Sequence, residues 1–147
     1  MEKIEVLSMY LECEEDEISE GYDEYTFEYG RQKYLVCTEE EADKRCEDYI
    51  LDTLWAFNTP FIMNYIDTRT NYEDKSLRKC LVALQGLCED SNYLIKLLVG
   101  NRINKFIKDA INSDGRGHYL SSFDGVEKEY SVFTDEGTVT YYIYRID

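Results

Sequence analysis

The sequence predicts an α+β fold, in which one antiparallel β-sheet packs against about three α-helices. Two observations lead to this class. Apolar and polar residues alternate near both ends of the chain, at 24–37 and 126–147, as they do in half-buried strands. Between them, from 38 to 114, apolar residues recur every three or four positions. A chain of 147 residues without a Pro-rich or Gly/Ser-rich linker fits a single domain, 1–147.

A β-hairpin is predicted ahead of the helical region. Tyr25, Phe27 and Tyr29 fall on one face of an extended strand. The turn at 30–32 then returns the chain, so that Tyr34 lies across from this face.

The first helix is predicted to begin after Thr38. Thr38 is a good N-cap, and Glu41 three residues later completes a capping box. Asn58, Thr59 and Pro60 are expected to end the helix. The residues expected to face the core are Ala42, Cys46, Ile50, Leu54 and Phe57.

Two further helices are predicted over 74–90 and 91–114. Ser91 is the expected cap of the second, and Gly100-Asn101 predicts a kink or a split within it. The apolar face of the first comprises Leu77, Cys80, Leu81, Leu84, Leu87 and Cys88. The inward residues of the second are Ile95, Leu98, Val99, Ile103, Phe106, Ile107 and Ala110.

The remainder of the chain is predicted to be β. The segments 118–125, 126–133 and 139–147 are expected to form two or three antiparallel strands, joined by turns at Asp124-Gly125 and Glu136-Gly137. The last strand is rich in Tyr and Ile, so pairing of its edge with a second copy, as a homodimer, is one expectation.

The charge of the chain is strongly asymmetric. The net charge is −15, and residues 1–74 contain 21 Asp and Glu against 6 Lys and Arg, whereas residues 75–147 contain 10 of each. Between Lys3 and Arg31 there are ten carboxylates and no basic residue. The whole excess of negative charge therefore lies in the first half.

This acidity predicts a surface that binds a basic partner. A dense array of carboxylates can compete with nucleic acid phosphates for the Lys and Arg side chains of a nucleic-acid-binding protein. Within the helix, two pairs of carboxylates four residues apart form rows that are expected to be largely unpaired. The alternative is an acidic face that only interacts with solvent. The candidate partner-binding residues are Glu12, Glu14, Glu15, Asp16, Glu17, Glu20, Asp23, Glu24, Glu40, Asp43, Glu47, Asp48 and Asp52.

The stretch "DGRGHYLSSFDG", residues 114–125, contains the only histidine of the chain. It favours a structural connection, because its glycines suit a helix end and sharp turns. The catalytic alternative is a small enzyme that acts on a nucleotide-like small molecule. It uses His118 as a general base, a serine as nucleophile, an aspartate as orienting group and an arginine that supplies positive charge. The other residues of that set are Asp114, Arg116, Ser121, Ser122 and Asp124. No metal site and no cofactor are predicted, because a second histidine or a spaced cysteine pair is lacking.

Other classes of function are disfavoured. A basic stripe of Lys96, Arg102, Lys105 and Lys108 suits phosphate contacts, but a net charge of −15 opposes direct binding to nucleic acid. No apolar segment is long enough to span a bilayer, so no membrane association is expected. The five cysteines are expected to be reduced and mostly buried in a cytosol.

A resemblance to a group of small proteins encoded by bacteriophages and prophages rests on three segments. These are "KYLVCTEEEADKRCEDYILDTLWAFN", "DGRGHYLSSFDGVEKEY" and "YYIYRID". The resemblance implies a bacteriophage product that acts in the cytoplasm of a bacterial host. In size and charge the chain also resembles anti-CRISPR and anti-restriction inhibitors. The expected function is therefore inhibition of a host defence nucleoprotein, by occupation of its basic nucleic-acid-binding surface.

Overall fold

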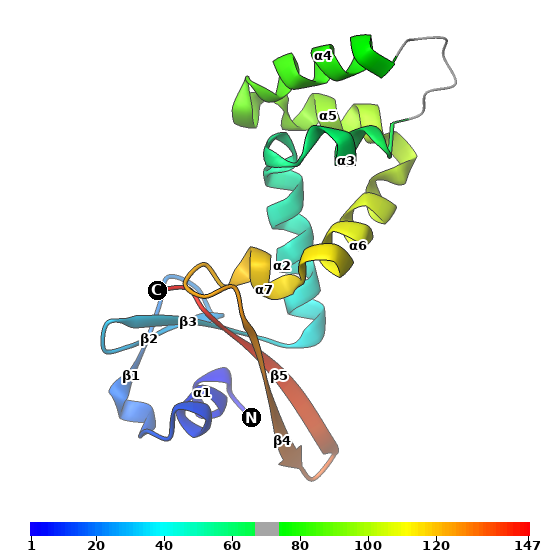
Figure 1. Cartoon of the computed structure of the whole chain (residues 1–147). Helices are drawn as coiled ribbons and strands as arrows, with labels where there is room; N and C mark the ends of the chain where they lie inside the picture. Colours follow the sequence, from blue (N-terminus) through cyan, green and yellow to red (C-terminus); the bar gives the residue numbers. More distant parts are fainter. Residues whose placement is uncertain (67–73) are drawn as a thin grey trace. The chain divides into compact units, whose positions relative to one another are not determined.

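The computed structural model describes residues 1–66 and 74–147. It confirms the α+β fold, with a five-stranded antiparallel sheet and helices α1 to α7, which is more than the predicted three or so helices (Figure 1). The chain forms two compact units. Unit 1 comprises Met1–Cys46 and Asp114–Asp147, and unit 2 comprises Glu47–Ser113. The boundaries between the units do not follow the change in charge at residue 74.

The sheet lies in unit 1 and draws strands from both ends of the chain. Its order is β1-β2-β3-β5-β4. The strands are β1 (Ile18–Glu20), β2 (Thr26–Tyr29), β3 (Gln32–Cys37), β4 (Glu127–Thr134) and β5 (Gly137–Arg145). The last strand, β5, is hydrogen-bonded to β3 on one side and to β4 on the other. The expectation that its edge is available to a second copy is therefore wrong, and the edge strands are β1 and β4.

The hairpin predicted near the N-terminal end is confirmed. Phe27 in β2 pairs with Tyr34 in β3, and Gly30 takes a φ of 60° in the turn, a conformation that favours glycine. Helix α1 (Lys3–Leu11) was not predicted and lies beside this sheet (Figure 1). Its fully buried Val6 and Leu7 pack with strand residues to form the core of unit 1.

Helix α2 (Glu39–Asp52) begins as predicted. The Thr38 N–H donates to Glu41 Oε2 at 3.1 Å, and the Glu41 N–H donates to Thr38 Oγ1 at 3.4 Å. The predicted inward residues Ala42, Cys46, Ile50 and Leu54 are fully buried. The predicted end at 58–60 is wrong, because α2 stops at Asp52 and a 3₁₀ turn, η2 (Leu54–Ala56), follows. Pro60 instead occupies the first turn of α3 (Thr59–Met63), where its missing N–H costs nothing.

The remaining helices of unit 2 are short. They are α4 (Asp74–Gln85), η3 (Cys88–Ser91), α5 (Asn92–Val99), η4 (Gly100–Arg102) and α6 (Ile103–Asp114). Gly100 has a φ of 59° and splits the long predicted helix in two, as expected. Ser91 does not cap α5, because its hydroxyl donates to the Cys88 carbonyl at 2.7 Å. In the part of the chain that the structure describes, no helix is both long enough and apolar enough to cross a bilayer.

The core of unit 2 is aromatic. Phe106 is fully buried, and its ring packs edge-on against those of Phe57, Phe61 and Tyr65 at centroid distances of 5.0, 4.9 and 5.2 Å. Several positions predicted to face the core lie at the surface instead. These exposed residues are Cys80, Leu87, Cys88 and Leu98.

The segment 118–125, predicted as a strand, is a helix followed by a loop. Helix α7 (Arg116–Leu120) follows Gly115, whose φ of 82° suits only glycine. Gly117 is required for close packing, since a Cβ there would lie 2.5 Å from the Gly125 carbonyl oxygen. Gly125 leads into β4 and does not form a hairpin turn. The hairpin between β4 and β5 confirms the second predicted turn, next to Gly137.

Candidate partner-binding site

Almost all of the net charge belongs to one unit. The sequence of unit 1 contains 22 Asp and Glu against 8 Lys and Arg, a net charge of −14. The sequence of unit 2 contains 9 against 8, a net charge of −1. An acidic binding surface is therefore a property of unit 1.

The acidic segment, residues 12–24, has a defined conformation. Glu12 takes a φ of 56° and ends α1. The Glu14 N–H donates to Glu17 Oε2 at 2.9 Å across the 3₁₀ turn η1 (Glu15–Glu17). Ile18 is buried and anchors the segment to the sheet. The carboxylates predicted as partner-binding that are exposed in this segment are Glu12, Glu14, Glu15, Asp16, Glu17, Glu20 and Glu24.

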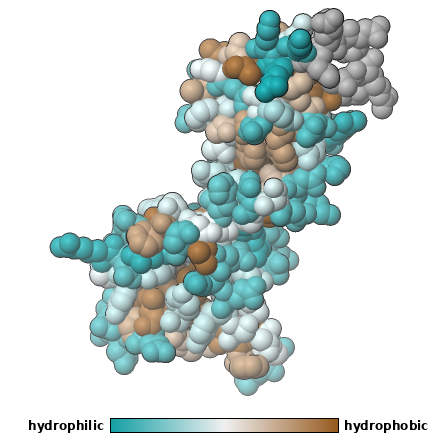
Figure 2. Space-filling view, viewed as in Figure 1, coloured by the Kyte–Doolittle hydropathy of each residue, from teal (hydrophilic) through white to brown (hydrophobic). Residues whose placement is uncertain are grey.

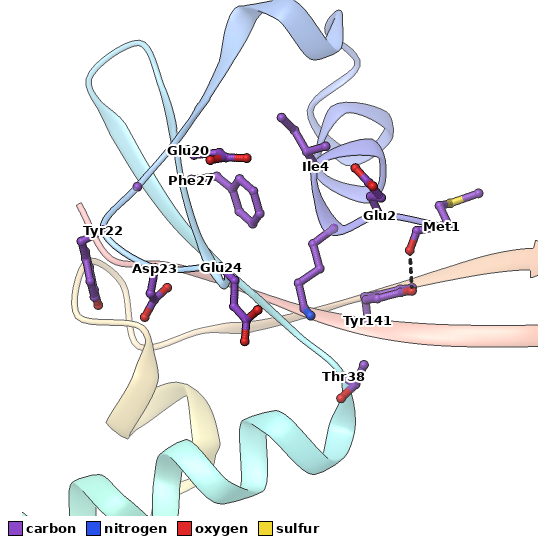
Figure 3. A pocket seen from close by; sticks show the side chains of 12 residues that line it. Met1, Glu2, Ile4, Glu20, Tyr22, Asp23, Glu24, Phe27, Thr38 and Tyr141 are labelled. Atoms are coloured by element: carbon purple, nitrogen blue, oxygen red, sulfur yellow. Dashed lines mark hydrogen bonds between the residues drawn. The ribbon is translucent and has the colours of Figure 1, made fainter.

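A pocket of about 640 Å³ lies at the end of this segment, between it and the start of α1 (Figure 3). We call it the acidic pocket. Phe27 and Tyr141 contribute nearly buried rings to it, and Tyr22, 79% exposed, lies at its rim. The full lining is Met1, Glu2, Lys3, Ile4, Glu20, Gly21, Tyr22, Asp23, Glu24, Phe27, Thr38 and Tyr141. It thus combines apolar surface with four carboxylates and one lysine.

Two ion pairs compensate charges in and around the acidic pocket. Lys3 Nζ lies 3.1 Å from Glu41 Oε1, and Arg45 Nη1 lies 3.4 Å from Asp23 Oδ2. Both cations also lie over the Tyr25 ring, at 4.9 and 5.3 Å from its centroid. These contacts fix the side of the pocket nearest to α2.

Glu20 and Glu24, unlike Asp23, do not pair with a basic side chain in the described part of the chain. In the described ranges 1–66 and 74–147, neither forms an ion pair with a Lys or Arg side chain. The neighbouring Glu24 carboxylate raises the pKa of the Tyr25 hydroxyl. The acidic pocket therefore retains an excess of negative charge beside an apolar floor.

The pKa of Asp23 is lowered below its ordinary value. Partial burial alone would raise it, but the Tyr25 N–H donates to Asp23 Oδ1 at 2.9 Å and the Thr26 hydroxyl donates to the same oxygen at 3.0 Å. The charge of Arg45 acts in the same direction. Asp23 is therefore held as a carboxylate that organises the pocket wall.

The acidic residues of α2 do not form the unpaired rows that the sequence predicted. Asp43 Oδ1 lies 2.9 Å from Arg116 Nη1, and Asp48 also has an interaction partner. Asp43 is therefore already neutralised, which corrects the prediction at this position. Glu40 and Asp52 are exposed, and Glu47 is half-buried. Glu47, Asp48 and Asp52 belong to unit 2 and not to the acidic unit.

Arg116, a member of the catalytic alternative, is the centre of a structural ion cluster. Its side chain is only 10% exposed, and it donates to Glu127 through both Nε and Nη2, at 2.9 and 3.0 Å. The guanidinium also lies over the Tyr142 ring at 4.4 Å. The Tyr144 hydroxyl donates to the same Glu127, and its pKa is raised by burial and by this carboxylate. Sequence reasoning missed Glu127 and the two tyrosines, because only the β4–β5 pairing brings them to Arg116.

The other members of the catalytic alternative are engaged separately. Ser121 is buried, and its hydroxyl lies 2.6 Å from Asp124 Oδ1 and 2.9 Å from the Arg145 carbonyl oxygen. Asp114 accepts a hydrogen bond from Tyr119 at 2.9 Å. His118 is exposed, and its ring packs edge-on against Tyr119.

Within the described residues, no side-chain hydrogen bond joins His118 to Ser121, Ser122, Asp114 or Asp124. The same part of the chain contains no group of three or more His, Cys, Asp or Glu side chains arranged to hold a metal ion. The elements of a catalytic triad are thus present in the sequence but are not brought together.

The predicted basic stripe is divided among three elements. Lys96 lies in α5, Arg102 in η4, and Lys105 and Lys108 in α6. Lys105 Nζ also pairs with Asp109 at 2.9 Å.

The acidic pocket is therefore the best-defined candidate site. Its apolar residues Ile4, Phe27 and Tyr141 could not be recognised from the sequence, because they carry no charge. Comparisons of the chain with protein-family models, with curated proteins and with solved structures found no match.

Proposed function

We propose that this protein binds a basic, nucleic-acid-binding protein through the acidic pocket and the acidic segment of unit 1. The observation that carries the proposal is the pair of carboxylates, Glu20 and Glu24, neither of which forms an ion pair with a Lys or Arg side chain in the described chain, beside the buried ring of Phe27. The exposed Tyr22 at the rim adds an aromatic side chain of the kind enriched in protein interfaces.

The chemistry of the pocket fits a lysine or arginine side chain of the partner. The methylene stem of such a residue can pack on Phe27 and Ile4, while its charged end reaches Glu20 or Glu24. Charge-assisted hydrogen bonds of this kind are about twice as strong as neutral ones. Basic residues that ordinarily contact phosphates would thereby be occupied.

In this proposal the partner is a host defence nucleoprotein, and the protein acts as an anti-CRISPR or anti-restriction inhibitor in the cytoplasm of a bacterium. One observation supports it. The net charge of −14 on unit 1 attracts basic surfaces at long range and repels nucleic acid itself. The biological setting is an expectation from the sequence alone, in which three segments resemble bacteriophage proteins. No cofactor takes part.

The test compares three forms of the chain as baits in a nuclease-treated bacterial lysate. They are the wild type, Glu20→Gln/Glu24→Gln, and the control Asp135→Asn/Glu136→Gln, which removes the same charge from the exposed β4–β5 turn. We expect the wild type and the control to retain the same nucleic-acid-binding protein and the pocket variant to lose it. Binding of the purified pair is expected to weaken steeply with salt and to be competed by DNA or RNA.

Equal recovery of the partner by all three forms would show that the pocket is not the binding surface. A phage infection assay then tests the inhibitory role. Expression of the wild type or of the control is expected to restore plaque formation in a strain protected by a CRISPR or restriction system, and expression of the pocket variant is not. No restoration by the wild type against either kind of system would refute the inhibitor proposal even if the binding were real.

A further inference from the structure

Helix α5 in unit 2 is apolar around almost its whole circumference. Ile95 and Val99 are buried, at 0% and 3% exposure. The opposite side carries four large apolar side chains, Tyr93 at 71% exposure, Leu94 at 48%, Leu97 at 58% and Leu98 at 42%. We call these four residues the outer face of α5. A helix that is hydrophobic all round is normally buried on all sides, so this face has the composition of a covered surface.

Hydrophobic residues are visible at the surface of this helical unit (Figure 2). The neighbouring helix contributes Val82, 53% exposed, and Leu87 follows it at 61%. Exposed apolar groups of this size on a folded unit usually mark a site of interaction with another protein.

The outer face of α5 is complementary to itself. At 100° per residue, its four positions span a sector of about 140°. The centre of this sector falls midway between Leu94 and Leu97, and also midway between Tyr93 and Leu98. A second copy turned end for end therefore places Leu94 against Leu97 and Tyr93 against Leu98, and this arrangement has the two-fold symmetry of an isologous dimer.

The charges that flank α5 fit the same register. Glu89 and Asp90 are exposed in η3 immediately before the helix, and Arg102 is exposed in η4 immediately after it. The antiparallel register that pairs the leucines also places the acidic end of each α5, preceded by Glu89, beside the end of the second copy that Arg102 follows. Opposite charges at the rim of an interface favour this orientation and oppose the parallel one.

Net charge also favours a second copy over a strongly charged partner at this face. Unit 2 has a net charge of only −1, so two such units repel one another weakly, in contrast to the −14 of unit 1. We propose that the chain forms a homodimer through antiparallel packing of the outer face of α5 against the same face of a second copy. The patch is small, which places the dimer in the class of weak and concentration-dependent assemblies.

The first test is sedimentation equilibrium of the full chain over about a hundredfold range of concentration, because a weak dimer dissociates by mass action on dilution. We expect the wild type to shift from monomer to dimer over this range. Leu97→Glu is expected to weaken association at least tenfold, since it places a carboxylate in the apolar contact. Phe133→Glu, a change at an 85% exposed residue of unit 1, is the matched control and is expected to dimerise as the wild type does. Circular dichroism checks that both variants are folded.

A charge exchange tests the register. Glu89→Arg and Arg102→Glu are each expected to weaken association, because each places like charges opposite one another. The double variant Glu89→Arg/Arg102→Glu is expected to regain the affinity of the wild type, since every copy then supplies both partners of the exchanged pair. A wild type that stays monomeric throughout, or a Leu97→Glu variant that associates equally well, overturns the dimer. Failure of the double variant to recover overturns the antiparallel register.

Discussion

Arg116 and Glu127 form a two-point ion pair, with Nε 2.9 Å from Oε2 and Nη2 3.0 Å from Oε1. This contact ties the short helix α7 to the first residue of β4, and the same guanidinium reaches Asp43 in α2. Three segments that are far apart in the sequence thus meet at one side chain. The arginine of the conspicuous "GRGH" sequence therefore has a structural role in unit 1.

Replacing Arg116 is expected to destabilise the protein strongly. Arg116→Leu leaves the half-buried Glu127 without its cationic partner, and removal of one member of a buried ion pair costs about 3–5 kcal/mol in the free energy of unfolding. Arg116→Lys is expected to lose part of this stability, since an ammonium cannot make the two parallel hydrogen bonds. Urea denaturation measures both.

The control is Arg31→Leu, a change at an exposed residue of the β2–β3 turn. It is expected to alter the free energy of unfolding by less than about 0.5 kcal/mol. Equal effects of the changes at Arg31 and Arg116 would show that the ion cluster does not stabilise unit 1.

Stability is expected to fall in acid partly through Asp23. Its pKa is lower in the folded protein than in the unfolded chain, so in the acid range the unfolded state binds more protons. The contribution of Asp23 is therefore complete above the unfolded pKa of about 3.9 and is lost as the pH falls through the folded pKa. Asp23→Asn is expected to reduce the slope of unfolding free energy against pH below about pH 5.

Thr26 offers the matched control for this pH dependence. Thr26→Val removes the hydroxyl that donates to Asp23 and is expected to reduce the acid slope in part, whereas Thr26→Ser keeps it. Denaturation curves collected between about pH 2 and pH 7 provide the measurement. An unchanged slope in Asp23→Asn would mean that other carboxylates determine acid unfolding.

Local signals in the sequence predicted the elements whose determinants are close together in the chain. The capping box of α2 needs only Thr38 and Glu41, and the β2–β3 hairpin needs only alternation and a glycine turn. The split of the long predicted helix at Gly100 is also a local feature, because the positive φ of this one glycine ends α5.

Elements that depend on distant contacts were missed or misplaced. Helix α7 was predicted as a strand, because its requirement for Gly117 arises from the approach of Gly125 and the start of β4. The acidic residues were recognisable by charge, but the ion pairs that neutralise some of them were not. Asp43 looks unpaired in sequence and is neutralised by Arg116, 73 residues away. Phe27, which lines the acidic pocket, likewise looks like an ordinary strand residue in the sequence.

Gly117→Ala is expected to destabilise unit 1. A Cβ at this position would lie 2.5 Å from the Gly125 carbonyl oxygen and 2.8 Å from the Glu127 nitrogen, both of which are backbone atoms. Relief of this overlap requires movement of α7 away from β4, at a cost of about 1–3 kcal/mol. Asn112→Ala, at an exposed position of α6, is the control for a change to alanine in a helix. Equal thermal unfolding midpoints for the two variants would argue against the close approach.

The cysteines are expected to separate into classes by their reactivity towards a thiol reagent. Cys80 and Cys88 are exposed in unit 2, contrary to the expectation that the thiols are mostly buried. Burial raises the pKa of Cys37 and of Cys46 to about 12, so little thiolate is present at either near neutral pH. Cys13 is half-buried, and its pKa is raised by burial and then by the neighbouring carboxylates Glu17 and Glu14.

Titration of the native protein with a chromogenic disulfide at about pH 8 distinguishes these classes, because only the thiolate is the nucleophile. We expect Cys80 and Cys88 to react rapidly, Cys13 more slowly, and Cys37 and Cys46 only after unfolding. The double variant Cys80→Ser/Cys88→Ser is expected to lose the fast phase and keep the slow one. Cys37 of β3 and Cys46 of α2 are fully buried. Rapid reaction of either thiol in the folded protein would therefore contradict the packing of these two elements.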